Sequence, residues 1–211
     1  MHKLIRDTDA PACLRQYLHG RNPWSEVTTD QRLCIWAKLD AMQGERCAYC
    51  EDAISPGNRH IEHFRQRGRY PQGTFDWPNL FGSCNRPGTC GNHKDSCGAY
   101  PHEDLIKPDV EDPELLLVFT PNGAVEPRAN LAPADRQRAL QTIRILGLDG
   151  ALTQIRRSHT SGYLQTALDL AQIAQEWPEE EWLPFLQDEL RATAMLPFAT
   201  AIKHVLTPQS E

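Results

Sequence analysis

Cys47-Ala-Tyr-Cys50 and Cys84-Asn-Arg-Pro-Gly-Thr-Cys90 are the two stretches on which the fold depends. The first places two thiols on one tight turn, the arrangement in which a tetrahedral Zn²⁺ accepts two ligands from one loop. In the second, Pro87-Gly88 can turn the chain back between the cysteines. We therefore expect one structural zinc ion, held by Cys47, Cys50, Cys84 and Cys90, with Cys97 as the replacement if Cys90 is not used.

The cysteine content and the N-terminal sequence indicate the cellular compartment in which the protein works. The chain has seven cysteines in 211 residues, and cysteine clustered with histidine in a reducing compartment favours a metal over disulfides. A redox-active Cys47/Cys50 pair is the weaker alternative, because no βαβ pattern surrounds it. Cys13 and Cys34 have no metal-spaced partner, so we expect small buried hydrophobic side chains there. The absence of a long apolar run or signal peptide predicts a soluble, cytoplasmic protein without membrane contact.

The charge is distributed unevenly along the chain. The net charge is −6, but residues 46–100 carry seven basic and five acidic side chains, whereas residues 101–211 carry nine basic and seventeen acidic ones. A pI near 5.8 therefore does not exclude nucleic-acid binding by the middle of the chain. The acidic end suits a protein partner.

The hydrophobic pattern divides the chain into three regions and predicts an α+β fold. Residues 1–45 form an N-terminal helical segment, with a helix over 31–43 capped by Asp30 and stopped by Gly44. Residues 46–130 contain turns, short extended pieces and a buried strand over 115–119, a loop-rich unit whose small core needs a metal. Residues 131–211 form a mostly α-helical region broken by Pro178, Pro184 and Pro197.

Four stretches carry a resemblance to a known family. They are Cys47-Ala-Tyr-Cys50-Glu51, His60-Ile-Glu-His-Phe-Arg65, Trp77-Pro-Asn-Leu-Phe-Gly-Ser-Cys84 and Cys90-Gly-Asn-His-Lys-Asp95. Their pattern resembles the HNH endonucleases, which carry the ββα-metal motif, and among them the PtuB-like proteins of retron and Septu anti-phage systems. The likeness implies a zinc-stapled nuclease core over residues 46–130, with the scissile phosphate between a strand and a helix.

Phosphodiester hydrolysis needs a base for the attacking water and a cation at the leaving oxygen. His63 is the best base, because imidazole is neutral and basic near pH 7. The resemblance implies that Glu62 binds a catalytic divalent ion, Mg²⁺ or Mn²⁺, although alternation along a strand points its carboxylate away from His63. It also implies that Asn79 orients the imidazole of His63 and that Lys94 contacts phosphate.

The sequence departs from the family at the last metal ligand. That ligand usually stands three residues before the lysine, where this chain has Gly91. The role then passes to His93, which we favour for a transition metal, or to Asn92, whose oxygen suits Mg²⁺.

Arginines follow His63 at alternate positions. Arg65, Arg67 and Arg69 would share one face of an extended segment, either as a phosphate-tracking strip or as an ordinary solvated face. We favour the strip, and with it Arg65 as a phosphate ligand. For His60, packing or hydrogen bonding is as good an interpretation as function.

These features predict a metal-dependent HNH endonuclease acting on nucleic acid, DNA rather than RNA, as the toxic effector of an anti-phage system. The resemblance implies that the acidic helical end docks on a PtuA-like ATPase, and a helical cap packed on the nuclease domain is the alternative. The second hypothesis is a zinc-stapled adaptor that binds nucleic acid or protein without catalysis, which the glycine at position 91 keeps open.

Overall fold

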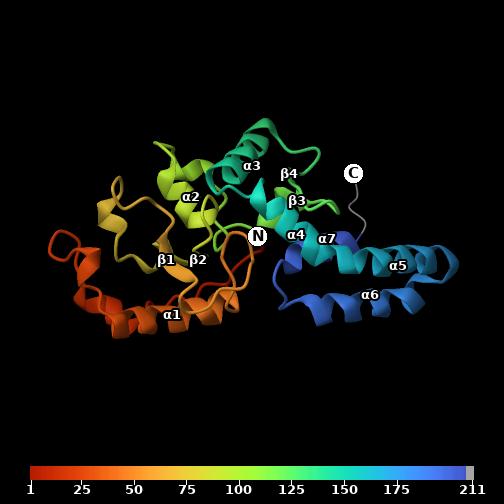
Figure 1. Cartoon of the computed structure of the whole chain (residues 1–211), viewed down its shortest axis with the longest axis horizontal. Helices are drawn as coiled ribbons and strands as arrows, with labels where there is room; N and C mark the ends of the chain where they lie inside the picture. The colour runs from red at the N-terminus through yellow and green to blue at the C-terminus, as the bar shows by residue number, and fades with distance from the viewer. Residues whose placement is uncertain (208–211) are drawn as a thin grey trace.

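The computed structural model describes residues 1–207, and its helices and small sheets confirm the α+β class. The helices are α1 (Thr29–Gln43), α2 (Cys90–Ser96), α3 (Pro133–Ile145), α4 (Ala151–Thr160), α5 (Leu164–Glu176), α6 (Glu179–Thr193) and α7 (Ala199–Leu206). Two antiparallel sheets pair β1 (Arg59–His63) with β2 (Leu80–Cys84) and β3 (Leu117–Phe119) with β4 (Val125–Pro127). The molecule is elongated, with α1 and β1 toward one end and α5 and α6 at the other (Figure 1). The last part of the predicted C-terminal region, 208–211, lies outside the described residues.

The ends of α1 show which sequence signals fix a helix. Thr28, rather than the predicted Asp30, is the N-cap, because its hydroxyl accepts from the Gln31 N–H while the Gln31 side chain accepts from the Thr28 N–H. Gly44 ends the helix as predicted, in the left-handed conformation at φ 60°.

The β1–β2 sheet lies between α1 and α2 (Figure 1). Arg59 pairs with Cys84 at one end of the sheet and His63 with Leu80 at the other. Every residue of β2 is buried. Gly82 in its centre gives the Trp36 ring of α1 room, since a Cβ there would lie 2.7 Å from that ring. The chain therefore forms two strands followed by a short helix on one side of the sheet.

Cys13 and Cys34 form a disulfide, with their Cα atoms 6.5 Å apart. The prediction of two unpaired, buried hydrophobic side chains is wrong, and both residues are half-buried. The pairing arises because the 3₁₀ turn Ala12–Gln16 packs back on α1. A contact between residues 21 positions apart leaves no local signal in the sequence.

Two predictions for the second half of the chain need correction. Residues Pro113–Leu115 form a 3₁₀ turn capped by Asp112, so the strand predicted over 115–119 is shorter and Leu115 is 68 % exposed. Pro184 lies inside α6 without ending it. It stands in the second turn of the helix, where few backbone bonds precede it.

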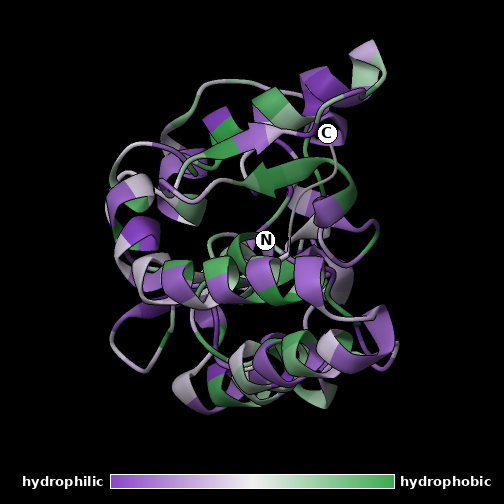
Figure 2. Cartoon of the chain, turned by 90° about the vertical axis from the view of Figure 1, so that its right-hand side faces the viewer, coloured by the Kyte–Doolittle hydropathy of each residue, from purple (hydrophilic) through white to green (hydrophobic). Residues whose placement is uncertain are grey.

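The C-terminal helices are anchored on the turn that carries the first cysteine pair. Arg46 donates to the carbonyls of Ala194 and Leu196, and the Glu51 carboxylate accepts from the Thr200 N–H at 3.0 Å. A small second core of Leu170, Leu186, Ile202 and Leu206 joins α5, α6 and α7. The helices carry both hydrophobic and hydrophilic bands (Figure 2). Within residues 1–207, no helix has the length and apolarity that crossing a membrane requires.

Candidate functional site

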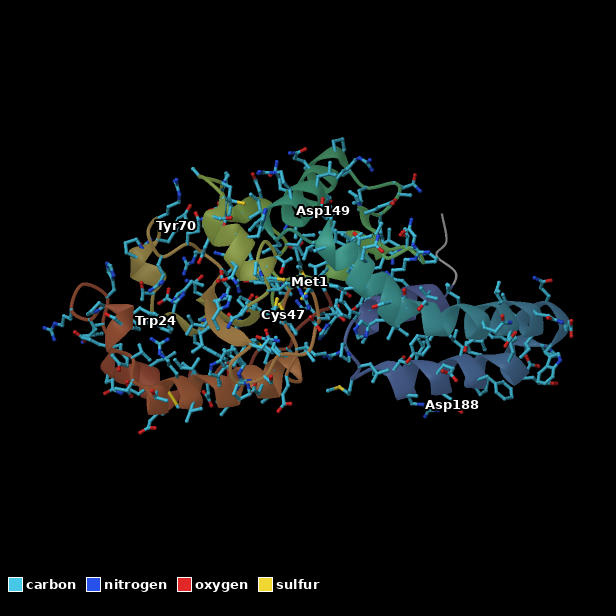
Figure 3. All side chains as sticks on the ribbon, in the orientation of Figure 1. Met1, Trp24, Cys47, Tyr70, Asp149 and Asp188 are labelled. Atoms are coloured by element: carbon cyan, nitrogen blue, oxygen red, sulfur yellow. A yellow bond between two sulfur atoms is a disulfide. The ribbon has the colours of Figure 1, made fainter. Side chains whose placement is uncertain are left out.

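Four buried thiols meet at the centre of the fold, where Cys47 lies between the β1–β2 sheet and the C-terminal helices (Figure 3). They are the predicted set, Cys47, Cys50, Cys84 and Cys90, and their sulfur atoms all lie within 4.8 Å of one another. The Sγ atoms of Cys50 and Cys84 are 3.9 Å apart. That distance matches the edge of about 3.8 Å in a tetrahedron with Zn–S bonds of ~2.3 Å. The cluster therefore fits a structural metal ion.

The local backbone aims these thiols inward. The Ala48 N–H donates to the Gly82 carbonyl of β2, and the Cys90 N–H donates to the Leu146 carbonyl at 2.7 Å. Cys90 has a positive φ of 53°, so the start of α2 is bent toward the cluster. Hydrogen bonds from neighbouring thiols, that of Cys47 first, hold the pKa of Cys84 far below its ordinary value, whereas burial raises the pKa of Cys90 well above it.

Cys97 lies outside this cluster. It is half-buried, and its Sγ is 3.7 Å from Nδ1 of His93. The structure thus brings Cys90, and not Cys97, to the other three thiols. Cys47 and Cys50 are two members of a group of four, which is not the arrangement of an isolated redox pair.

Glu62 reaches from β1 to α2. Its carboxylate is 2 % exposed, with Oε1 2.6 Å from Nζ of Lys94 and Oε2 3.2 Å from Nε2 of His60. Lys94 is fully buried and also contacts Asp95 at 2.8 Å. Burial alone would lower the pKa of Lys94, but the carboxylates of Glu62 and Asp95 raise it above its ordinary value. Lys94 thus neutralises Glu62 instead of standing free for a phosphate.

His63 is the last residue of β1 and is held from two sides. Nε2 lies 3.0 Å from the Thr74 carbonyl, so it carries the proton and Nδ1 keeps its lone pair. The Trp24 ring meets the imidazole edge to face, with centroids 4.5 Å apart. Burial first, and the charge of Arg67 second, lower the pKa of His63 to about 3. The side chain is therefore a neutral imidazole at physiological pH.

Asn79 fixes the loop that leaves and returns to the His63 strand. Its Oδ1 accepts from the Arg65 N–H at 2.8 Å, and its Nδ2 donates to the Gly73 carbonyl at 2.9 Å. The Phe64 N–H donates to the Asn79 carbonyl at 2.9 Å. The side chain is buried and holds the segment that carries Thr74, the hydrogen-bond partner of His63.

His93 and Asn92 do not meet Glu62. Nδ1 of His93 lies 3.0 Å from the Ile145 carbonyl of α3, and Asn92 is exposed. Successive residues of a helix are rotated by about 100°, so the residues of α2 that face β1 are Gly91 and Lys94. The geometry therefore corrects the expectation that position 92 or 93 completes a metal site with Glu62.

A cavity of about 350 Å³ opens beside the sheet. Neighbouring side chains on a strand normally point to opposite faces. Glu62 and His63 nevertheless both line this cavity, because His63 stands where β1 ends and the chain bends. The cavity is lined by Trp24, Arg32, Trp36, Arg59, His60, Ile61, Glu62, His63, Arg67 and Asp95.

The arginines after His63 do not form the predicted strip. Residues 67–69 form a turn, so the three guanidinium groups share no extended face. Arg65 is paired with Asp76 at 3.0 Å. Arg67 is exposed and is the one of the three that lines the cavity.

Sequence reasoning missed the part of the cavity supplied by the first 45 residues. Arg32 from α1 and Trp24 before it line the cavity, and Arg59 lies over the Trp36 ring at 3.9 Å while pairing with Asp40 at 2.6 Å. In the first 45 residues the sequence shows only a helical period. That period indicates a buried face but not which distant residues the face contacts.

Comparisons with known proteins include a distant relative of this chain. No model of a known protein family matches the chain. A protein of Vibrio cholerae serotype O1 biovar El Tor, described as a candidate HNH endonuclease of retron Vc95, is 26 % identical over 126 residues. The match covers 57 % of this chain and 60 % of that protein, so it spans less than two thirds of the relative's length.

Proposed function

We propose that the protein is a metal-dependent, HNH-type endonuclease that hydrolyses phosphodiester bonds of nucleic acid. One observation carries the proposal: the cavity collects a neutral imidazole with a free Nδ1, a buried carboxylate and guanidinium groups. The arrangement of β1, β2 and α2 has the order of a ββα-metal motif. The likeness to the Vibrio cholerae protein supports the same class.

In this mechanism His63 is the general base. The Thr74 carbonyl fixes the Nε2–H tautomer, so Nδ1 accepts the proton of the water that attacks phosphorus. Asn79 acts as a positioning residue, because it holds the loop that carries Thr74. The exposed Arg67 at the cavity binds the phosphate oxygens and places the scissile bond in front of Nδ1.

The buried carboxylate of Glu62 provides a place for a divalent ion at the same cavity. Such an ion, when bound, supplies a Lewis acid that stabilises charge on the phosphoryl and leaving oxygens. Lys94 fixes the Glu62 carboxylate between β1 and α2. The four-cysteine cluster holds zinc with no open ligand position, and its role is to fix β2 and the start of α2.

We also propose the biological setting. The protein acts as the toxic effector of an anti-phage system in the cytoplasm, with DNA as the favoured substrate, and the description of the relative as a retron protein supports the retron setting. Exposed Leu168, Trp177 and Phe185 on the acidic α5–α6 pair suit a protein partner, which we assign to a PtuA-like ATPase.

The test is a cleavage assay with the purified, zinc-loaded chain. Plasmid DNA, single-stranded DNA and tRNA are incubated with Mg²⁺, Mn²⁺ or chelator, alone and with the candidate ATPase. We expect metal-dependent nicking that is strongest on DNA. Tight binding of nucleic acid without cleavage in every combination would favour the non-catalytic adaptor.

A further inference from the structure

The face of α2 that meets Glu62 leaves no room for a side chain at Gly91. A Cβ built there would lie 2.5 Å from Oε2 of Glu62 and 2.7 Å from Nε2 of His60. Both distances are shorter than any ordinary carbon contact. Two polar atoms of β1 thus occupy the space into which a side chain of α2 would project.

His60 is the residue that fills this space. It stands two positions before Glu62 on β1, so the two side chains share one face of the strand. Nδ1 of His60 lies 2.8 Å from Oδ1 of Asn85, whose Nδ2 donates to the Arg59 carbonyl. This network places the proton of the neutral ring on Nδ1 and turns the Nε2 lone pair toward Glu62.

The spacing of these two atoms suits a shared cation. Nε2 of His60 and Oε2 of Glu62 are 3.2 Å apart. Adjacent ligands of an octahedral ion with bonds of about 2.1 Å lie ~3.0 Å apart. The His60 side chain is 28 % exposed on the cavity that His63 also lines, so an ion and its waters can reach the pair.

We propose that His60 and Glu62 form the metal-binding pair of the cavity and that the imidazole from β1 takes the place of a ligand from α2. This inference rests on the proposed function. It also specifies the ion, because a nitrogen ligand favours Mn²⁺ and later transition metals over Mg²⁺.

Metal binding tests the pair separately from catalysis. Mn²⁺ is titrated into the zinc-loaded full chain, and free Mn²⁺ is followed by electron paramagnetic resonance. We expect His60→Ala and Glu62→Gln to weaken Mn²⁺ binding at least about tenfold, since even an outer partner of a ligand contributes on that scale. His93→Ala tests the competing ligand, and its Mn²⁺ affinity should equal that of the unmodified chain. Zinc content and far-UV circular dichroism establish that each variant is folded.

Moving the imidazole from position 60 to position 91 tests the assignment of His60 further. Gly91→His alone should lose Mn²⁺ affinity, because its side chain collides with His60, whereas His60→Ala combined with Gly91→His should regain most of it. Wild-type Mn²⁺ affinity in His60→Ala, or its loss in His93→Ala, would overturn the assignment even if the protein cleaves DNA. Mn²⁺ binding that needs His60 in a protein that cleaves nothing would instead overturn the proposed function and leave the site standing.

Discussion

The buried ion pair between Glu62 and Lys94 makes a quantitative prediction about how α2 is held on β1. Nζ and Oε1 are 2.6 Å apart, and the side chains are 0 % and 2 % exposed. At an effective dielectric constant of ~20, their attraction is about 6 kcal/mol, and desolvation of both charges offsets most of it. Removing one partner leaves the other charge buried, at a cost of about 3–5 kcal/mol.

Each of the two charged groups keeps a second partner when the other is removed. The cost of each single substitution should therefore lie at the lower end of that range. Lys94 keeps Asp95 at 2.8 Å, and Glu62 keeps His60 at 3.2 Å. We expect Glu62→Gln and Lys94→Met each to lower the free energy of unfolding by about 3 kcal/mol. The double variant buries no unpaired charge, so it should be less destabilised than the sum, with a coupling of at least ~2 kcal/mol.

Urea unfolding of the four proteins, without added divalent ion, gives this coupling energy. The pair Arg191–Asp188 is the matched control, since its side chains are 75 % and 68 % exposed and its coupling should be under ~0.5 kcal/mol. A coupling for Glu62 and Lys94 as small as that of the control would refute the account of α2 docking.

Three further predictions follow from the same site. Cys47→Ser should lose the tightly held zinc and unfold the middle of the chain, whereas Cys97→Ser should keep both, as metal analysis will show; one zinc retained in Cys47→Ser would contradict the cluster. Asn79→Ala should cost about 1–3 kcal/mol in urea unfolding, because it leaves the Arg65 N–H unpaired and leaves the Gly73 carbonyl with the Asp76 N–H as its donor, and Asn79→Asp, which keeps the acceptor, should recover part of it. His63 has a folded pKa of about 3, below its unfolded value, so the unfolded chain binds the proton first and stability falls as pH drops below 6.5. Between pH 6.5 and 4.5 the wild type should lose roughly 2–3 kcal/mol more than His63→Gln, and equal pH slopes would show that the imidazole is not held neutral.

The cysteine cluster could be predicted from the sequence because most of its geometry is local. Cys47 and Cys50 lie on one turn, Cys84 and Cys90 are joined by a short excursion, and only the meeting of the two pairs is long-range. The sequence could not show in the same way which residues of α2 face β1. Cys90 enters the helix with a positive φ to reach the cluster, and this rotation turns Gly91 and Lys94, rather than His93, toward β1.

The cavity shows a second limit of reading the sequence alone. His63 and Glu62 were visible as a motif, but Trp24 and Arg32 join them through packing of the first 45 residues on β1. The prediction of an arginine strip was wrong for a local reason. Alternation is informative only where the chain is extended, and the residues after His63 turn back so that Asn79 can bond the Arg65 backbone.

The single-turnover rate of DNA nicking by His63→Ala, compared with the unmodified chain at saturating Mn²⁺, tests the central claim most directly. We expect a rate lower by about 10²–10⁴-fold, the contribution of a general base, with zinc content and Mn²⁺ affinity unchanged. Nicking by His63→Ala at the full rate would contradict the assignment of His63 as the base and with it the proposed mechanism.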